Sequence, residues 1–228
     1  AAVLCGRHWF DGCVLALAAG ARITWQAAEG ARLRAGDTLC EIEANARALL
    51  SAERPALNFL QLLSATATLT RAHVDAIAGA SPNPRGCAIL DTRKTLPGLR
   101  QAQKYAVRVG GGRNQRLALW HGILVKGLAQ ARALEAEVEI QIEVESLEQL
   151  AQALAHGATS IMLDNFDLTD MRRAVALTAG RAELEVSGGV QLEQLRAIAE
   201  TGVDRISIGA LTKNVRAVDL SMRVIERL

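Results

Sequence analysis

The sequence predicts an α/β fold in which a small β-rich unit precedes an α/β barrel with fewer than eight strands. Three observations support this. Short apolar runs alternate with helical patterns through the second half of the chain, polar residues follow every run, and the last four runs begin at 138, 160, 182 and 205. Steps of 22 or 23 residues match one strand plus one crossover helix, which indicates parallel strands.

Residues 1–84 form the first predicted unit. Apolar side chains recur at helical spacing through 1–20, and the pattern in 21–50 changes to the alternation of short strands. A long helix is expected from about Arg54 to Ala78, and two prolines then mark a linker.

Residues 85–228 form the second predicted unit, whose C-terminal helix can return to the first. An open doubly wound sheet is the alternative architecture. We favour a barrel because polar residues follow every strand, whereas a doubly wound sheet concentrates them at one switch point. The six predicted strands begin at Cys87, Ile123, Val138, Ser160, Ala182 and Arg205.

The residues at the ends of these strands fall into three chemical groups. Cations follow the first two strands, carboxylates end the next two, and glycines follow the last two. In a barrel all these positions share the face on which active sites are built. They are Arg93 and Lys94, then Lys126, then Glu143 and Asp164, then Ser187, Gly188, Gly189 and Gly209.

Each group alone has a simpler explanation, as solvated side chains, helix caps or turns. Together they indicate more. Glycines before a helix suit a phosphate, carboxylates suit sugar hydroxyls or hydrated Mg²⁺, and guanidinium groups bind carboxylates in a bidentate fashion. The combination predicts a site for a sugar phosphate and an acidic co-substrate.

Composition excludes other classes. The net charge is only +2, from 26 basic and 24 acidic residues, and aromatic residues make up 3%. A nucleic-acid-binding domain usually shows a basic excess, so we expect no nucleic-acid partner. We expect no membrane span and no signal peptide either. Four cysteines without metal-like spacing fit reduced thiols in a cytoplasmic protein.

Several motifs resemble one enzyme family, the quinolinate phosphoribosyltransferases. The first is Asp-Thr-Arg-Lys-Thr-Leu-Pro-Gly-Leu-Arg from Asp91, followed by Gly-Gly-Gly-Arg-Asn from Gly110. Leu-Asp-Asn-Phe from Leu163, Ser-Gly-Gly from Ser187 and Ile-Gly-Ala-Leu-Thr-Lys from Ile208 are similar too. The resemblance covers nearly the whole chain.

The resemblance implies an N-terminal α/β sandwich, a C-terminal open α/β barrel of six or seven strands, and a homodimer with shared active sites. It implies conversion of quinolinate and phosphoribosyl pyrophosphate to nicotinate mononucleotide, CO₂ and pyrophosphate, with Mg²⁺, in NAD biosynthesis.

The resemblance also assigns roles to residues. Arg54 would reach the neighbouring subunit's site, and Lys213 would lie beside the phosphate loop. Glu143 and Asp164 would face ribose hydroxyls and the metal, through water, and both count with Lys94 and Lys126 as catalytic candidates. The quinolinate-facing set is Arg93, Lys94, Gln115, Arg116 and Lys126, and the phosphate set is Ser187, Gly188, Gly189 and Gly209.

Two departures from the family pattern stand out. Gln115 replaces the usual His, so this side chain can donate a hydrogen bond but cannot carry a charge. The segment after Lys126 is shorter than in the family. Either the sequence omits a loop there or this homologue has lost it. Two alternative functions stay open: a nicotinate phosphoribosyltransferase, whose fold is similar, and a non-catalytic paralogue of the same fold, which these two departures would support.

Overall fold

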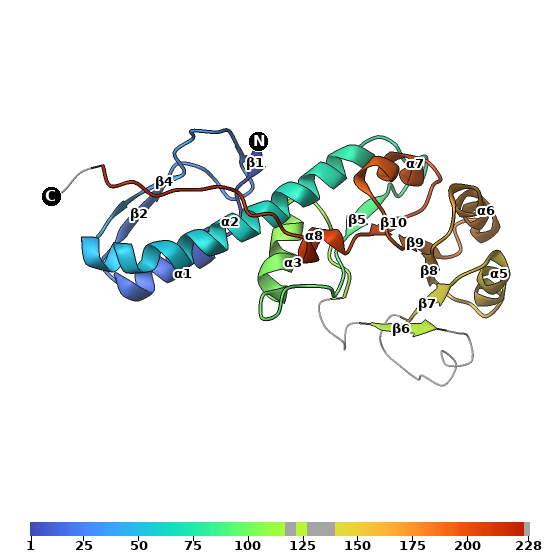
Figure 1. Cartoon of the computed structure of the whole chain (residues 1–228). Helices are drawn as coiled ribbons and strands as arrows, with labels where there is room; N and C mark the ends of the chain where they lie inside the picture. The colour runs from blue at the N-terminus through green and yellow to red at the C-terminus, as the bar shows by residue number, and fades with distance from the viewer. Residues whose placement is uncertain (117–121, 127–139, 226–228) are drawn as a thin grey trace. The chain divides into compact units, whose positions relative to one another are not determined.

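The computed structural model describes residues 1–116, 122–126 and 140–225. These residues form two compact units (Figure 1). The first contains Ala1–Arg71, Leu96–Gly111 and the chain from Ala210 onward, and the second contains Ala72–Thr95 and Gly112–Gly209. The predicted boundary between residues 84 and 85 stays a prediction.

The first unit contains two small antiparallel sheets. β1 (Ala2–Val3) pairs with β3 (Arg32–Leu33), and β2 (Arg22–Trp25) pairs with β4 (Cys40–Glu43). The expected helix over 1–20 is wrong for the first six residues, because α1 covers only Arg7–Leu17. Gly6 precedes it with φ 109°, and a side chain there would press on Leu63. This conformation turns the chain from the strand into the helix.

The long helix α2 (Ala46–Ile77) begins eight residues before the predicted start at Arg54. The prediction placed Pro55 in the first turn, where its missing N–H costs nothing. The structure instead holds Pro55 inside the helix, at the cost of one backbone hydrogen bond. Ala52 and Ala56 flank the proline fully buried in the core with Phe10, so packing favours helix on both sides.

The C-terminal segment also belongs to the first unit. α3 (Arg100–Val109) contacts the short helix α8 (Ala210–Lys213), and the described chain then continues as far as residue 225 without a helix or strand. Two hydrogen bonds hold that continuation to α2, from Val218 N to Gln61 O and from Gln61 Nε2 to Leu220 O.

The second unit is built on a six-stranded parallel sheet, as predicted. The strand order is β5-β10-β9-β8-β7-β6, and every neighbouring pair is parallel. The strands are β5 (Ala88–Leu90), β6 (Ile123–Lys126), β7 (Ile140–Val144), β8 (Ser160–Asp164), β9 (Glu183–Ser187) and β10 (Arg205–Ser207).

The strand order identifies an open barrel. β6 to β10 follow one another in chain order, and the first strand of the unit, β5, then pairs with the last, β10. In the part of the chain that is described, the other side of β5 carries only a bridge from Leu90 to Arg113 and no pairing with β6. The cycle is therefore interrupted between β5 and β6, where a closed barrel would be continuous.

Helices follow β7, β8 and β9 as the crossover pattern requires. They are α5 (Leu147–Ala155), α6 (Leu168–Thr178) and a 3₁₀ turn (Leu192–Gln194) that leads into α7 (Leu195–Ala199). Figure 1 shows these helices beside one another along the strands. The side chains of Ser146 and Asp167 accept hydrogen bonds from backbone N–H groups of the first turns of α5 and α6, so each helix starts at a defined residue.

No helix among the described residues combines the length and hydropathy that a membrane span needs.

Candidate active site at the carboxyl ends of the barrel strands

Parallel pairing brings several predicted site residues together at the carboxyl ends of the strands. Lys126 of β6 pairs with Glu143 of β7, and Asp164 of β8 pairs with Ser187 of β9. Only the backbone of Lys126 is described, and the segment that follows it, 127–139, lies outside the described residues. Residues from four consecutive strands thus lie side by side along one edge of the sheet.

Three carboxylates form an acidic cluster at this edge. One oxygen from each of Glu143, Glu145 and Asp164 lies within 4.8 Å of the others. Glu143 and Asp164 are half-buried and Glu145 is exposed. Sequence analysis missed Glu145. Its spacing of two residues from Glu143 was the available signal, because extended chain that continues past the end of a strand keeps alternate side chains on the same face. Oxygen donors of this kind are what Mg²⁺ binds, so the cluster fits that ion.

The loop after β9 is shaped for close approach of a ligand to the backbone. Gly188 and Gly189 have φ values of 110° and 54°, which residues with a side chain rarely adopt. A Cβ on Gly188 would collide with the side chain of Asn165, and the Asn165 amide also donates to Asp164 at 3.1 Å. Both glycines are exposed and Ser187 and Gly209 are half-buried, so backbone N–H groups in this region are accessible to an anion.

The buried carboxylate of Asp91 joins the two cationic loops. It accepts a hydrogen bond from the Asn114 side chain at 2.6 Å and one from the Gln115 backbone N–H at 2.9 Å. The first loop carries Arg93 and Lys94, both exposed, and the second carries Arg116. Asp91 therefore fixes the two strand-end segments to one another.

The two arginines lie close enough to interact electrostatically. Burial, and then the charge of Arg93, lower the pKa of Arg116 from its usual value, while the carboxylate of Glu185 acts in the opposite direction. Arg116 also donates to the Gly122 carbonyl at 2.7 Å. A dianion bound between Arg93 and Arg116 would relieve their repulsion, which is what a dicarboxylate substrate offers.

A largely buried polar network lies on the side of the sheet toward which Glu143 and Ser187 point. We call Gln115, Gln141, Glu185 and Ser207 the interior network. Sequence analysis singled out only Gln115. The other three stand two residues before Glu143, Ser187 and Gly209, so strand alternation was a signal that could have found them.

Arg54 and Lys213 belong to the first unit, and both are exposed. Arg54 lies within α2 and makes a 3.6 Å ion pair with the adjacent Glu53.

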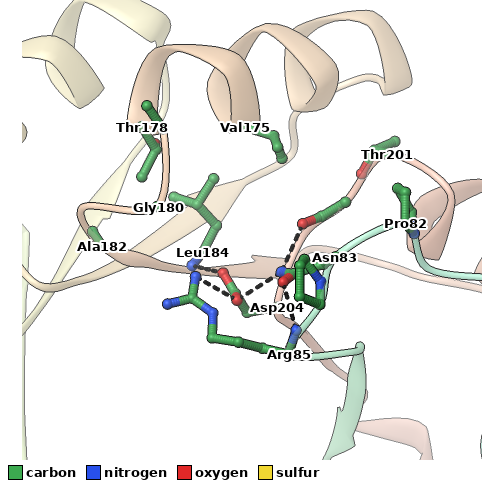
Figure 2. Close-up of a pocket in the computed structure, with 13 residues that line it drawn as sticks. Pro82, Asn83, Arg85, Val175, Thr178, Gly180, Ala182, Leu184, Thr201 and Asp204 are labelled. Atoms are coloured by element: carbon green, nitrogen blue, oxygen red, sulfur yellow. Dashed lines mark hydrogen bonds and ion pairs between the residues drawn. The ribbon is translucent and has the colours of Figure 1, made fainter.

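A separate cavity of about 310 Å³ lies near the amino ends of the strands (Figure 2). Its polar side is built on Asp204, which accepts hydrogen bonds from Asn83 Nδ2 at 2.8 Å and from the Leu184 backbone N–H at 2.9 Å. Arg85 adds an ion pair at 2.8 Å. These contacts hold the segment before β5 against β9 and the start of β10, so we assign this cluster a structural role.

Comparison with known proteins agrees with this geometry. Residues 1–64 match the N-terminal domain of quinolinate phosphoribosyl transferase, and residues 66–223 match its C-terminal domain. The chain is 44% identical to nicotinate-nucleotide pyrophosphorylase (carboxylating) of Mycobacterium leprae, over 89% of this chain and 75% of that protein. It is 42% identical to the probable enzyme of that name from Bacillus subtilis, over 86% of this chain and 71% of that protein.

A solved structure gives the same result. The nicotinate-nucleotide pyrophosphorylase from Francisella tularensis superimposes with a TM-score of 0.90 at 39% identity, covering 96% of this chain and 81% of that one. On the matched domains, the relatives and the shared fold, the chain belongs to the quinolinate phosphoribosyltransferase family.

Proposed function

We propose that this chain catalyses decarboxylating phosphoribosyl transfer from phosphoribosyl pyrophosphate to quinolinate. The products are nicotinate mononucleotide, CO₂ and pyrophosphate, in NAD biosynthesis. The observation that carries the proposal is the pair Arg93 and Arg116, held by Asp91 on the barrel face that also carries the glycine loop and the acidic cluster. One face thus offers cations for a dicarboxylate and backbone N–H groups for a phosphate.

The substrate would be held by charge and by backbone donors. Quinolinate is a dianion, and Arg93, Lys94, Arg116 and Lys126 can offset the cost of removing its carboxylates from water. Ser187, Gly188, Gly189 and Gly209 are the proposed phosphate contacts, since the positive φ of the two central glycines allows backbone N–H groups to converge on an anion.

The reaction needs orientation and electrostatic stabilisation more than a covalent nucleophile. When pyrophosphate leaves, positive charge develops on the ribose, and the carboxylates of Glu143 and Asp164 can stabilise it. The ring nitrogen of quinolinate then bonds to the ribose and becomes cationic. That cation accepts the electron pair released when the 2-carboxylate leaves as CO₂, and a proton takes the vacated ring position.

Mg²⁺ is the proposed cofactor, and the acidic cluster of Glu143, Glu145 and Asp164 would hold it, partly through water. Bound there, the ion would neutralise charge on the pyrophosphate leaving group. The residues themselves bind and orient the ribose hydroxyls.

We further propose a cytoplasmic homodimer with shared active sites and no nucleic-acid partner. The exposed guanidinium of Arg54 is the group that would enter the neighbouring subunit's site. The near balance of charge, a net +2 over 228 residues, supports small anionic substrates over a nucleic acid.

The deciding experiment is turnover with phosphoribosyl pyrophosphate and Mg²⁺, comparing quinolinate carrying a labelled 2-carboxylate with nicotinate. We expect labelled CO₂ and nicotinate mononucleotide in equal amounts from quinolinate, and no product without phosphoribosyl pyrophosphate. Preference for nicotinate would make the chain a nicotinate phosphoribosyltransferase. A folded protein without turnover on either substrate would be a non-catalytic paralogue.

A further inference from the structure

The interior network surrounds one fully buried carboxylate. Glu185 has no exposed surface, and Ser207 and Gln141 are 5% and 9% exposed. The Glu185 carboxylate accepts hydrogen bonds from the Ser207 hydroxyl, from Gln115 Nε2 at 3.1 Å and from Gln141 Nε2 at 2.8 Å. Three neutral donors from three separate parts of the chain therefore converge on it.

These contacts determine which way the Gln115 amide points. Its Nε2 lies between Glu185 and the Gln141 side-chain oxygen, at 3.1 and 3.5 Å. Rotating the amide by half a turn would place its oxygen against the Glu185 carboxylate, where two acceptors would face each other. The Gln115 N–H groups thus point into the barrel. The role expected for Gln115, donation to a substrate carboxylate, would require those same N–H groups to leave Glu185.

The network is linked directly to the cationic loops. The backbone N–H of Gln115 donates to Asp91, so Glu185 and Asp91 hold the same residue from two sides. Arg116 follows immediately, and the Glu185 charge acts on its guanidinium in the sense opposite to that of Arg93. Glu185 thereby holds the turn before Arg116 and partly offsets the repulsion between the two arginines.

We propose that Glu185 is a positioning residue for quinolinate, acting through Gln115 to hold Arg116 where the dicarboxylate binds. The proposal rests on the function proposed above. Glu185 itself does not contact the substrate in this scheme. Its contribution is the orientation of one amide and the placement of one guanidinium, so its loss affects the dicarboxylate more than the phosphoribosyl donor.

A double-mutant cycle tests this. We expect Glu185→Gln and Gln115→Leu each to raise the KM for quinolinate about tenfold, the scale of one lost hydrogen bond to a charged group. The KM for phosphoribosyl pyrophosphate should change less than about threefold. The KM for quinolinate of the double variant should be no higher than that of the worse single variant, because both substitutions break the same contact between Glu185 and Gln115. Glu183→Gln is the matched control, since Glu183 lies on the same strand and pairs instead with Arg205.

Two results would overturn the proposal. One is a double variant in which the two increases in the KM for quinolinate multiply, which would mean that the residues act independently. The other is an equal rise in both KM values, which a general structural defect would produce. If Glu185→Gln fails to give a cooperative thermal transition, Ser207→Ala replaces it in the cycle, because Ser207 donates to the same carboxylate. Absence of quinolinate turnover by the unmodified protein would instead refute the proposed function, whatever the variants do.

Discussion

Asp91 and Gln115 are joined by a 2.9 Å hydrogen bond from the Gln115 backbone N–H to the Asp91 carboxylate, across 24 residues of sequence. Asp91 is fully buried and directly follows β5, whereas Gln115 belongs to the loop that leads toward β6. Because the barrel is open between these strands, this contact replaces part of the missing strand pairing. It makes the positions of Arg93 and Arg116 depend on one carboxylate.

Replacing Asp91 by Asn should therefore damage both stability and catalysis. One amide N–H₂ would face the donors of Asn114 and Gln115, leaving buried groups unpaired at a cost of about 1–3 kcal/mol. We expect a lower free energy of unfolding in urea and a lower kcat/KM for quinolinate. Asp170→Asn, at a half-buried helix position whose carboxylate forms a surface ion pair with Arg173, is the control and should change stability by less than about 1 kcal/mol. Wild-type kinetics in Asp91→Asn would show that the loops do not need this contact.

Arg93→Ala should remove most of the binding of quinolinate. An arginine that pairs with a substrate carboxylate typically contributes enough for a loss of about a hundredfold in kcat/KM. This loss in kcat/KM should come mainly from a higher KM for quinolinate and only slightly from a lower kcat. Arg172→Ala, at an exposed position of α6, matches the substitution without touching the site and should leave steady-state kinetics unchanged. Equal kinetics of the two variants would exclude Arg93 from the site.

The acidic cluster should bind Mg²⁺, and Glu145 should contribute to it. We expect Glu145→Gln to raise the Mg²⁺ concentration for half-maximal activity by about three- to tenfold, because removing one carboxylate charge weakens a hard-cation site. Glu143→Gln and Asp164→Asn should have larger effects. Calorimetric titration with Mg²⁺ supplies a readout independent of turnover, and Glu148→Gln in the first turn of α5 is the control. Unaltered metal affinity in all three variants would place the ion elsewhere.

Shared active sites predict complementation between inactive variants. Arg54→Ala removes the group proposed to act across subunits, and Lys126→Ala removes one that acts within its own subunit. Random mixing places both variants in half of the dimers, each with one intact site, so activity should recover to about a quarter of wild type. Each variant mixed with itself is the control. Verified subunit exchange without recovery would mean that Arg54 serves its own subunit or none.

Asp204 should matter for stability and not for the reaction. Asp204→Ala removes a carboxylate that is 8% exposed, leaves the Leu184 N–H without its acceptor and takes from Asn83 Nδ2 one of its two acceptors, the other being the Gly202 carbonyl (Figure 2). The expected loss is about 2–4 kcal/mol in urea unfolding. Arg85→Ala should cost under about 1 kcal/mol, since half of that side chain is in solvent. Unchanged KM values in both variants would agree with a structural role; a substrate-specific change would contradict it.

The succession of strands and helices followed from local patterns. The runs that begin at Ser160, Ala182 and Arg205 correspond to β8, β9 and β10, and the helical patterns expected between strands correspond to helices such as α5 and α6. Apolar periodicity sets which face of a short element is buried, and that information is local. The ends of the elements were harder to predict from sequence. A proline usually marks the first turn of a helix, but at Pro55 the packing of neighbouring residues extends α2 to Ala46.

The candidate site divides in the same way. The amino-acid pattern was enough to place Arg93 and the glycines after Ser187 just beyond strands and Glu143 and Asp164 at strand ends, and so to predict that they share one end of a parallel sheet. That Glu145 joins the acidic cluster, and that Glu185 orients the Gln115 amide inward, became visible in the folded protein alone. The physical reason is that these roles depend on hydrogen bonds and burial between residues up to 70 positions apart, which strand register and barrel curvature create.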